Sequence, residues 1–228
     1  FIPFYRLKIR LKKEIVTIGK NDVKPEIVTG KHITPKNWDK ILCDKNYIII
    51  DTRNTYEVNI GSFKNALNPM TKSFREFPNY IEKLNLNKNQ PIAMFCTGGI
   101  RCEKASSYLL SNGYKNIYQL DGGILNYLDF KKNKKKSLWN GDCFVFDNRV
   151  AVDKNLQKSS FDQCYGCRQP ITKEDKKLKS YKKGVSCKYC IRTKTGIKKN
   201  SSLTRQLQID AAEKNNKNHP FKKIYSKY

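Results

Sequence analysis

A short apolar run, Pro91–Phe95, leads directly into Cys96-Thr97-Gly98-Gly99-Ile100-Arg101, and helical apolar spacing follows at Cys102–Ser111. This order predicts a buried strand that ends in a glycine-rich loop at the start of a helix. The helix is expected to stop at Asn112-Gly113, a typical C-terminal cap. A strand, a loop and a helix in this order form the repeating unit of parallel α/β sheets.

The same alternation continues on both sides of the loop. Strands are expected at Tyr47–Ile50 and Asn116–Leu120. Helices are expected from Thr34-Pro35 onward, around Phe74–Leu84 with an interruption near Pro78, and at Ile124–Phe130. We therefore predict an α/β fold, a parallel sheet with helices on both faces. Because such sheets carry their sites at the carboxyl ends of strands, Asp51 and Cys96 are expected at one edge.

Composition shifts suggest four segments. Residues 1–29 are an arm and linker: residues 1–20 alternate apolar and basic residues, as an extended strand or connecting arm would, and the rest is polar. Residues 30–130 hold the predicted sheet. The basic run KKNKKK opens a linker segment at 131–156, within which residues 139–147 alternate like a strand. Residues 157–228 are rich in Cys, Lys and Asn and are expected to form a small module with a disordered tail after about Ala212.

The loop is suited to hold a reactive thiolate at Cys96. Backbone N–H groups of Thr97, Gly98, Gly99 and Ile100 can surround the sulfur, and the helix dipole and Arg101 add positive charge. Four residues separate Cys96 from Arg101, whereas cysteine phosphatases use Cys-x5-Arg. The shorter loop favours a sulfur adduct, such as a persulfide, over phosphate.

Three further residues are candidates for supporting roles. Asp51 and Arg53 are expected to form a buried ion pair beneath the loop, which Glu57 can join. Cys102 begins the helix six residues after Cys96. Two interpretations of Cys102 stay open: a resolving thiol that forms a disulfide with oxidised Cys96, or a small residue packed under the loop.

The chain contains eight cysteines, and four of them form two C-x-x-C pairs. This usage indicates metal binding and thiol chemistry in a reducing compartment rather than a disulfide framework. The pairs have the spacing of a structural zinc site in which every position is taken by a thiolate. A redox-active quartet is the alternative. The predicted ligands are Cys164, Cys167, Cys187 and Cys190.

The formal charge of +26 invites a polyanionic partner, although A/T-rich codon usage alone can enrich Lys, Asn, Ile and Tyr. Local clustering is therefore the better guide. Residues 151–228 hold 20 Lys plus Arg against 6 Asp plus Glu. Aromatic and cationic side chains mix around the second cysteine pair, a combination suited to single-stranded RNA. The candidate RNA-binding residues are Lys188, Arg192 and Lys194, with Tyr181 and Tyr189 beside them.

Several stretches resemble the bacterial tRNA uridine hydroxylase family, which has a rhodanese domain at its centre. The most specific is CTGGIRCEKAS at 96–106. Others are IDTRNTYEVNIGSFKNALNP (50–69), FREFP (74–78), YQLDGGILNYL (118–128) and WNGDCFVFDNRVAV (139–152). The resemblance covers roughly residues 1–200 and makes 30–130 the rhodanese domain.

The resemblance implies hydroxylation of carbon 5 of the wobble uridine in tRNA, with molecular oxygen as co-substrate and Cys96 as the catalytic cysteine. It also implies a further α/β domain before residue 1 and contact with the tRNA anticodon region. A sulfurtransferase that carries a persulfide on Cys96 is the alternative enzyme, and an RNA-binding module without catalysis is the third. No apolar run reaches the ~20 residues of a membrane span, so a cytoplasmic protein is expected.

Overall fold

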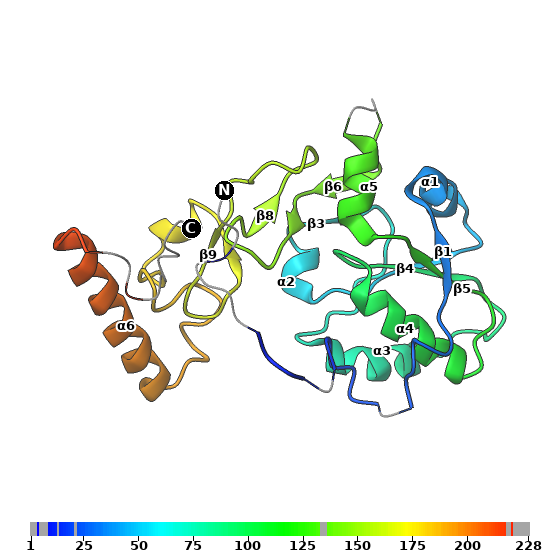
Figure 1. The fold of residues 1–228 in the computed structure, drawn as a ribbon, viewed down its shortest axis with the longest axis horizontal. Coiled ribbons are helices and arrows are strands. Elements are labelled where there is room, and N and C mark those ends of the chain that lie inside the picture. The colour runs from blue at the N-terminus through cyan, green and yellow to red at the C-terminus, as the bar shows by residue number, and fades with distance from the viewer. Residues whose placement is uncertain are drawn as a thin grey trace. The chain divides into compact units, whose positions relative to one another are not determined.

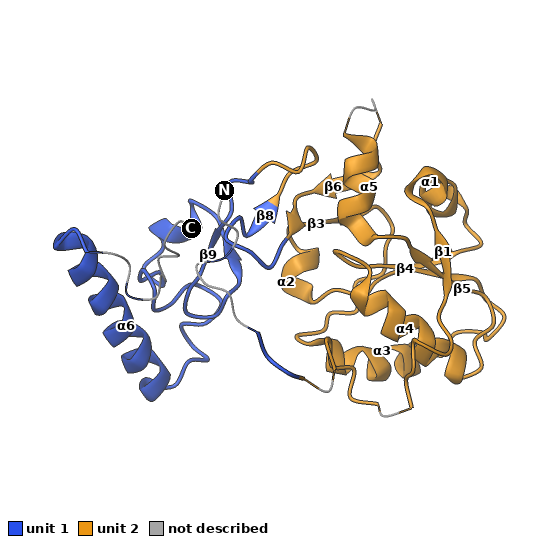
Figure 2. Cartoon of the chain, in the orientation of Figure 1, with its two compact units in different colours: residues 1–11, 145–151, 158–228 blue, residues 12–144, 152–157 orange. Residues whose placement is uncertain are grey.

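The computed structural model describes residues 4, 9–12, 14–20, 22–132, 136–217 and 220. Two compact units are coloured separately in Figure 2. The sheet unit comprises residues 12–144 and 152–157, and the cysteine unit comprises residues 1–11, 145–151 and 158–228. No helix among the described residues is long and apolar enough to cross a membrane.

The sheet unit is built on four parallel strands in the order β1-β5-β4-β2. They are β1 (Lys31–Ile33), β2 (Ile48–Asp51), β4 (Ile92–Phe95) and β5 (Ile117–Leu120). The last three were predicted from their apolar runs. The three-residue strand β1 was not, because Lys31 and His32 are exposed and its pairing with β5 is entirely long-range.

Helices cover both faces of this sheet, as Figure 1 shows. Helices α1 and α5 lie on one face, and α3 and α4 lie on the other. The bounds are α1 Pro35–Cys43, α2 Thr55–Val58, α3 Phe77–Leu84, α4 Ile100–Ser111 and α5 Gly123–Lys131. The arrangement confirms the predicted α/β fold class, a rhodanese-like parallel sheet.

Two helix starts differ in detail from the sequence prediction. Pro78 does not interrupt a helix: a 3-10 turn, η1 (Phe74–Glu76), precedes it, and Pro78 lies in the first turn of α3. Proline is tolerated there because the first helical N–H groups have no partner in the helix. Thr34 occupies the N-cap of α1 before Pro35, but its side chain makes no capping hydrogen bond.

A second strand pair extends the sheet unit. Strand β3 (Gly61–Phe63) pairs antiparallel with β6 (Trp139–Gly141), and β7 (Cys143–Phe144) follows. Residues 139–144, which were predicted to lie in a linker, therefore belong to the sheet unit. Of the basic run at 131–136, residues 133–135 lie outside the described residues.

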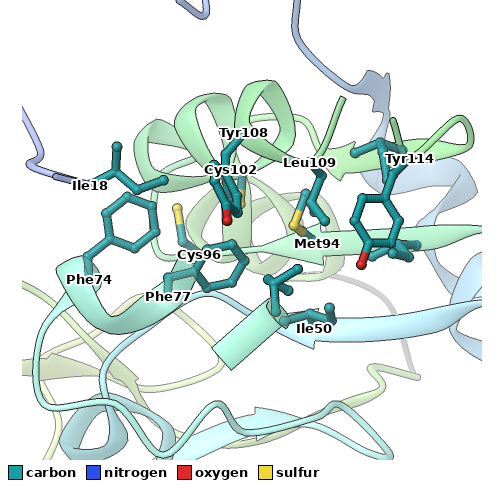
Figure 3. Packing of buried hydrophobic residues seen from close by; sticks show 14 residues of the cluster. Ile18, Ile50, Phe74, Phe77, Met94, Cys96, Cys102, Tyr108, Leu109 and Tyr114 are labelled. Carbon is teal, nitrogen blue, oxygen red and sulfur yellow. The ribbon is translucent and has the colours of Figure 1, made fainter. Parts of the chain in front are cut away.

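Each face of the sheet has its own core. Beneath α1 and α5, the rings of Trp38, Phe63, Phe95 and Tyr127 meet largely edge to face. Beneath α3 and α4 lies the cluster of Figure 3, which includes the catalytic candidate Cys96 and the neighbouring Cys102. Ile18 from the N-terminal arm completes this second cluster with 1% of its surface exposed. The described parts of the arm contain no strand, contrary to one expectation.

The cysteine unit contains little regular structure before its last helix. It has β9 (Asp162–Gln163) paired with β10 (Pro170–Ile171), the 3-10 turn η2 (Asp175–Lys177), and α6 (Gly196–Lys214). The short strand β8 (Ala151–Val152) lies at the boundary between the units, with Val152 assigned to the sheet unit. Helix α6 was not predicted, and it continues past Ala212, where disorder was expected. Residues 218, 219 and 221–228 lie outside the described residues.

Candidate functional site

The strand register places the candidate residues at one edge of the sheet. Asp51 pairs with Phe95, so that Thr52 and Cys96 follow the carboxyl ends of neighbouring parallel strands. The Thr52 hydroxyl donates a hydrogen bond to the Phe95 carbonyl at 3.1 Å and lies 3.6 Å from the Cys102 sulfur. The loop 96–101 therefore lies where open α/β sheets carry their sites.

The loop curls so that its own amides surround the Cys96 sulfur. The Gly99 N–H donates to Sγ at 3.1 Å. The N–H groups of Arg101 and Cys102, in the first turn of α4, also donate to it. Converging N–H groups at a helix N-terminus stabilise an anion. Of the loop amides expected around the sulfur, those of Gly99 and Arg101 donate to it, and the amide of Cys102 is added to them.

The two loop glycines are not equivalent. Gly99 has φ +90°, a left-handed conformation that side chains with a Cβ atom rarely adopt, and it is the N-cap of α4. Gly98 is exposed, and a Cβ atom there would meet nothing within 4 Å. Only Gly99 is required by the backbone, a distinction that the sequence prediction did not make.

The start of α5 holds the loop from the other side. The N–H groups of Ile124 and Leu125 donate to the carbonyls of Cys96 and Thr97 at 2.9 and 3.1 Å. A Cβ atom on Gly123 would lie 2.5 Å from the Cys96 carbonyl oxygen, and its φ is +67°. Gly123 is therefore a site residue that sequence reasoning interpreted only as part of a turn.

The environment favours the thiolate form of Cys96. A hydrogen bond from the Cys102 thiol, the charge of Arg101 and the loop amides outweigh burial and lower the pKa of Cys96 to about 6. Burial and the same hydrogen bond raise the pKa of Cys102 well above its usual value. At neutral pH the pair therefore holds one proton, on Cys102, and one negative charge, on Cys96.

Alkylation of Cys96 by iodoacetamide is expected to be half-maximal near pH 6, because only the thiolate reacts. In Cys102→Ala the midpoint should rise toward the ordinary value of about 8.5, since the largest stabilising hydrogen bond is lost. Mass spectrometry of the tryptic peptide 89–101 over a pH series measures the midpoint. A wild-type midpoint near that of an ordinary cysteine would contradict the thiolate assignment.

The positive charge of Arg101 does not act on the Cys96 sulfur in full. Its guanidinium makes a bidentate pair with Glu57, with Nη1–Oε2 and Nη2–Oε1 distances of 2.6 and 2.7 Å. Glu57 is fully buried and also accepts a hydrogen bond from the Asn54 N–H at 3.1 Å. Arg101 thus braces the loop against α2 while still favouring the thiolate. The sequence prediction had Glu57 joining Asp51 and Arg53 instead.

Asp51 and Arg53 form the expected ion pair, and both are fully buried. The guanidinium donates to both carboxylate oxygens at 2.8 and 2.6 Å and to the Gly61 carbonyl at 2.6 Å. The Ser62 hydroxyl donates to the same carboxylate, and Arg53 lies 5.2 Å from the centre of the Trp139 ring. These contacts tie β2 to β3 and β6, so the pair supports the edge of the sheet rather than the reacting sulfur.

A third thiol, Cys143, lies in the same region and was not singled out from the sequence. Burial is the main cause that raises its pKa to about 12, against the opposing charge of Arg53. It therefore stays protonated at neutral pH. Its sulfur contacts its neighbour's carbonyl, that of Phe144, at 3.7 Å.

The reactive sulfur lies under apolar side chains. Cys96 exposes 2% of its surface, and Ile18 and Phe74 belong to the same cluster (Figure 3). Outside this cover, Gly98 and the half-exposed Ile100 form the solvent side of the loop.

The four predicted metal ligands come together in the cysteine unit. Their sulfur atoms all lie within 4.8 Å of one another, with individual separations of 3.7 to 4.0 Å. Four sulfurs at about 2.3 Å from a tetrahedral zinc ion would be roughly 3.8 Å apart. The donor set Cys164, Cys167, Cys187 and Cys190 therefore fits a closed tetrahedral metal site.

The candidate RNA-binding residues differ in their surroundings. Lys188 pairs with Asp175 at 2.7 Å and lies 4.9 Å from the Tyr189 ring. Lys194 donates to the Val185 carbonyl and to a serine hydroxyl, so it stabilises the module itself. Arg192 is exposed.

The aromatic residues beside the two cysteine pairs also differ in their exposure to solvent. Tyr189 is 45% exposed, whereas Tyr181 packs against the cysteine cluster. Tyr165, beside Cys164, is 42% exposed and was not singled out from the sequence. The corresponding residue of the second pair, Lys188, was considered there only for its charge. The more exposed rings beside the two cysteine pairs are thus Tyr165 and Tyr189.

Comparison with known proteins identifies residues 34–129 as a match to the rhodanese-like domain family. A rhodanese-related protein from Thermoplasma volcanium is 25% identical, over 44% of this chain and 92% of that one, with a TM-score of 0.37. A rhodanese-like domain protein from Staphylococcus aureus is 27% identical over 42% and 90%, with a TM-score of 0.36. A polysulfide-sulfur transferase from Wolinella succinogenes is 24% identical over 44% and 74%, with a TM-score of 0.37.

Proposed function

We propose, on the premise of a rhodanese-like domain at 34–129, that this chain belongs to a tRNA-modifying enzyme in which Cys96 is the catalytic thiolate. The proposed reaction is oxygen-dependent hydroxylation of carbon 5 of the wobble uridine. The thiolate in its amide nest is the observation that carries the catalytic part of the proposal. The substrate is taken from the resemblance of CTGGIRCEKAS and its companion stretches to the hydroxylase family.

Each residue of the site has a distinct part in this proposal. Cys96 supplies the reactive sulfur, and Gly99, Arg101 and Cys102 stabilise its negative charge through N–H groups. Glu57 fixes the Arg101 side chain, and the start of α5 fixes the loop backbone. The apolar cover excludes water from the sulfur.

Sulfur transfer is the second candidate function, and one observation favours it. The same nest that stabilises a thiolate also stabilises the terminal negative charge of a persulfide on Cys96. A sulfurtransferase would accept sulfur from a donor such as thiosulfate and pass it to a nucleophile. Both candidates need Cys96, so the product distinguishes them.

We further infer that the cysteine unit holds a structural zinc ion and contacts the RNA. Four thiolates leave no open coordination position, so the ion stabilises the module and takes no part in the reaction. The exposed Arg192, Tyr165 and Tyr189 surround the two cysteine pairs. Cationic and aromatic side chains of this kind bind phosphates and stack on unpaired bases.

Cells that carry the full-length protein are expected to contain 5-hydroxyuridine at the tRNA wobble position, and cells with Cys96→Ala are expected to lack it. The reason is that alanine removes the sulfur and leaves the rest of the nest in place. Mass spectrometry of nucleosides from purified tRNA measures the modification. Cys43→Ala, which removes the exposed thiol of α1, is the matched control and should retain it.

The outcomes separate the three functions. Unchanged hydroxylation in Cys96→Ala would exclude the proposed role. Rapid transfer of sulfur from thiosulfate to cyanide by the purified protein, with no effect on wobble uridine, would favour the sulfurtransferase. Binding of tRNA with neither reaction would favour an RNA-binding module.

A further inference from the structure

A second buried thiol, that of Cys102, lies in the same packed cluster as the Cys96 sulfur. Its influence lowers the pKa of Cys96. Figure 3 shows the two side chains next to each other at one end of the apolar cluster, Cys96 from the end of β4 and Cys102 from the first turn of α4. Cys102 is fully buried, and its other polar neighbour is the Thr52 hydroxyl at 3.6 Å.

The pair has the asymmetry that disulfide formation requires. Cys96 carries the negative charge and reacts first, while the Cys102 thiol keeps its proton as long as Cys96 is anionic. Burial still raises the pKa of Cys102 once Cys96 is oxidised to a neutral sulfenic acid, but the further rise that anionic Cys96 causes is gone. Cys102 can then ionise and attack the oxidised sulfur.

Among the described residues, Cys143 is the other buried thiol near this site, and it is a weaker candidate. Its sulfur lies 3.7 Å from the Phe144 carbonyl oxygen, and it is not part of the packed cluster that holds Cys96 and Cys102. Cys43 is exposed on α1. The geometry therefore selects Cys102 as the partner of Cys96.

We propose that Cys96 and Cys102 are a dithiol that supplies the two electrons of the hydroxylation and closes to a disulfide in each turnover. This inference rests on the proposed function. One oxygen atom of O2 enters the C5–H bond of uridine, and the other leaves as water. The pair provides two electrons and the proton of Cys102, a second proton comes from solvent, and an S–S bond forms between Cys96 and Cys102. An external dithiol then reopens it by exchange and becomes oxidised itself.

The first experiment needs no tRNA. The purified chain is treated with one equivalent of hydrogen peroxide, blocked with N-ethylmaleimide in acid and digested with trypsin. Peroxide converts Cys96 to a sulfenic acid, and attack by Cys102 releases water. Trypsin cuts after Lys88, Arg101 and Lys104, so the two cysteines fall in separate peptides, 89–101 and 102–104. A disulfide is then detected as a linked pair of these peptides.

The linked pair is expected in the wild type and in Cys143→Ala, and it should be absent from Cys102→Ser. In that variant Cys96 should stay a sulfenic acid and should become the sulfinic acid when a second equivalent of peroxide is added, because no thiol intercepts the sulfenic acid. A wild-type chain that gives sulfinic Cys96 with Cys102 still blocked by maleimide would overturn the proposal. So would a disulfide between Cys96 and Cys143.

A single-turnover reaction distinguishes a wrong dithiol proposal from a wrong proposed function. Reduced full-length protein, freed of reductant, is mixed with tRNA and oxygen. One 5-hydroxyuridine is expected for each Cys96–Cys102 disulfide formed, and added dithiol should restart the reaction. Hydroxylation without any disulfide would overturn the dithiol role alone. Absence of 5-hydroxyuridine would contradict the proposed function, while the peroxide result would still report on the pair.

Discussion

Chelation of zinc is expected to unfold the cysteine unit and leave the sheet unit folded. The apolar core of that unit is small: the four cysteines are joined by Ile171 and the half-buried Tyr181. Its strands β9 and β10 have two residues each. Metal binding to four thiolates contributes about 10–16 kcal/mol in zinc-finger peptides, far more than such a core supplies. Loss of the ion should therefore remove the fold of residues 158–217.

The chain offers a clean way to observe the two units apart. Both of its tryptophans, Trp38 and Trp139, are buried in the sheet unit. After chelation their fluorescence should be unchanged, while trypsin should rapidly cut the lysine-rich segment between the two cysteine pairs. Cys164→Ser and Cys187→Ser should behave like the chelated protein, and Cys43→Ser should not. A metal-free chain whose cysteine unit resists trypsin would contradict the zinc assignment.

Removal of Glu57 is expected to destabilise the sheet unit by about 3–5 kcal/mol, because it leaves the buried Arg101 guanidinium without its partner. The measurement is urea unfolding followed by tryptophan fluorescence of Glu57→Ala. Glu82→Ala is the matched control: that carboxylate is 60% exposed and lies 3.9 Å from Lys20. It should change the free energy of unfolding by less than about 1 kcal/mol.

The same variant should make Cys96 more acidic. Glu57 neutralises part of the Arg101 charge, so its removal lets that charge act more strongly on the sulfur. The alkylation midpoint of Glu57→Ala should therefore fall below that of the wild type. In the double variant Glu57→Leu with Arg101→Met, stability should recover because both charges of this pair are removed together, while the midpoint should rise. A Glu57→Ala variant as stable as the wild type would show that the pair does not brace the loop.

Much of the site could be read from local sequence. A buried apolar run that ends at Cys96 and is followed by a helix predicts a strand–loop–helix junction. Gly99 suits the left-handed position within that loop. The spacing of the two C-x-x-C pairs likewise brings four sulfurs together. These features depend on residues that are close in the chain, where backbone preference and side-chain periodicity decide the structure.

Helix α6 shows why other parts could not be read in this way. It begins at Gly196, and of its residues only Ser202 and Gln206 are buried. No apolar stripe marks it. It is held by tertiary hydrogen bonds instead: Arg205 donates to the carbonyls of Tyr165 and Gly184. Polar contacts between distant segments leave no periodic signal in the sequence.

For the loop at Cys96, the sequence alone determined that a thiolate could be stabilised there, because glycine, arginine and a helix start follow the cysteine directly. Tertiary structure alone decided which groups stabilise the Cys96 thiolate. Pairing of β2 with β4 brings Thr52 and α2 beside the loop. Glu57 can therefore form an ion pair with Arg101. The Cys102 thiol, which α4 carries into the same buried cluster, then helps to lower the pKa of Cys96. Such contacts depend on strand register and helix packing, which local sequence does not specify.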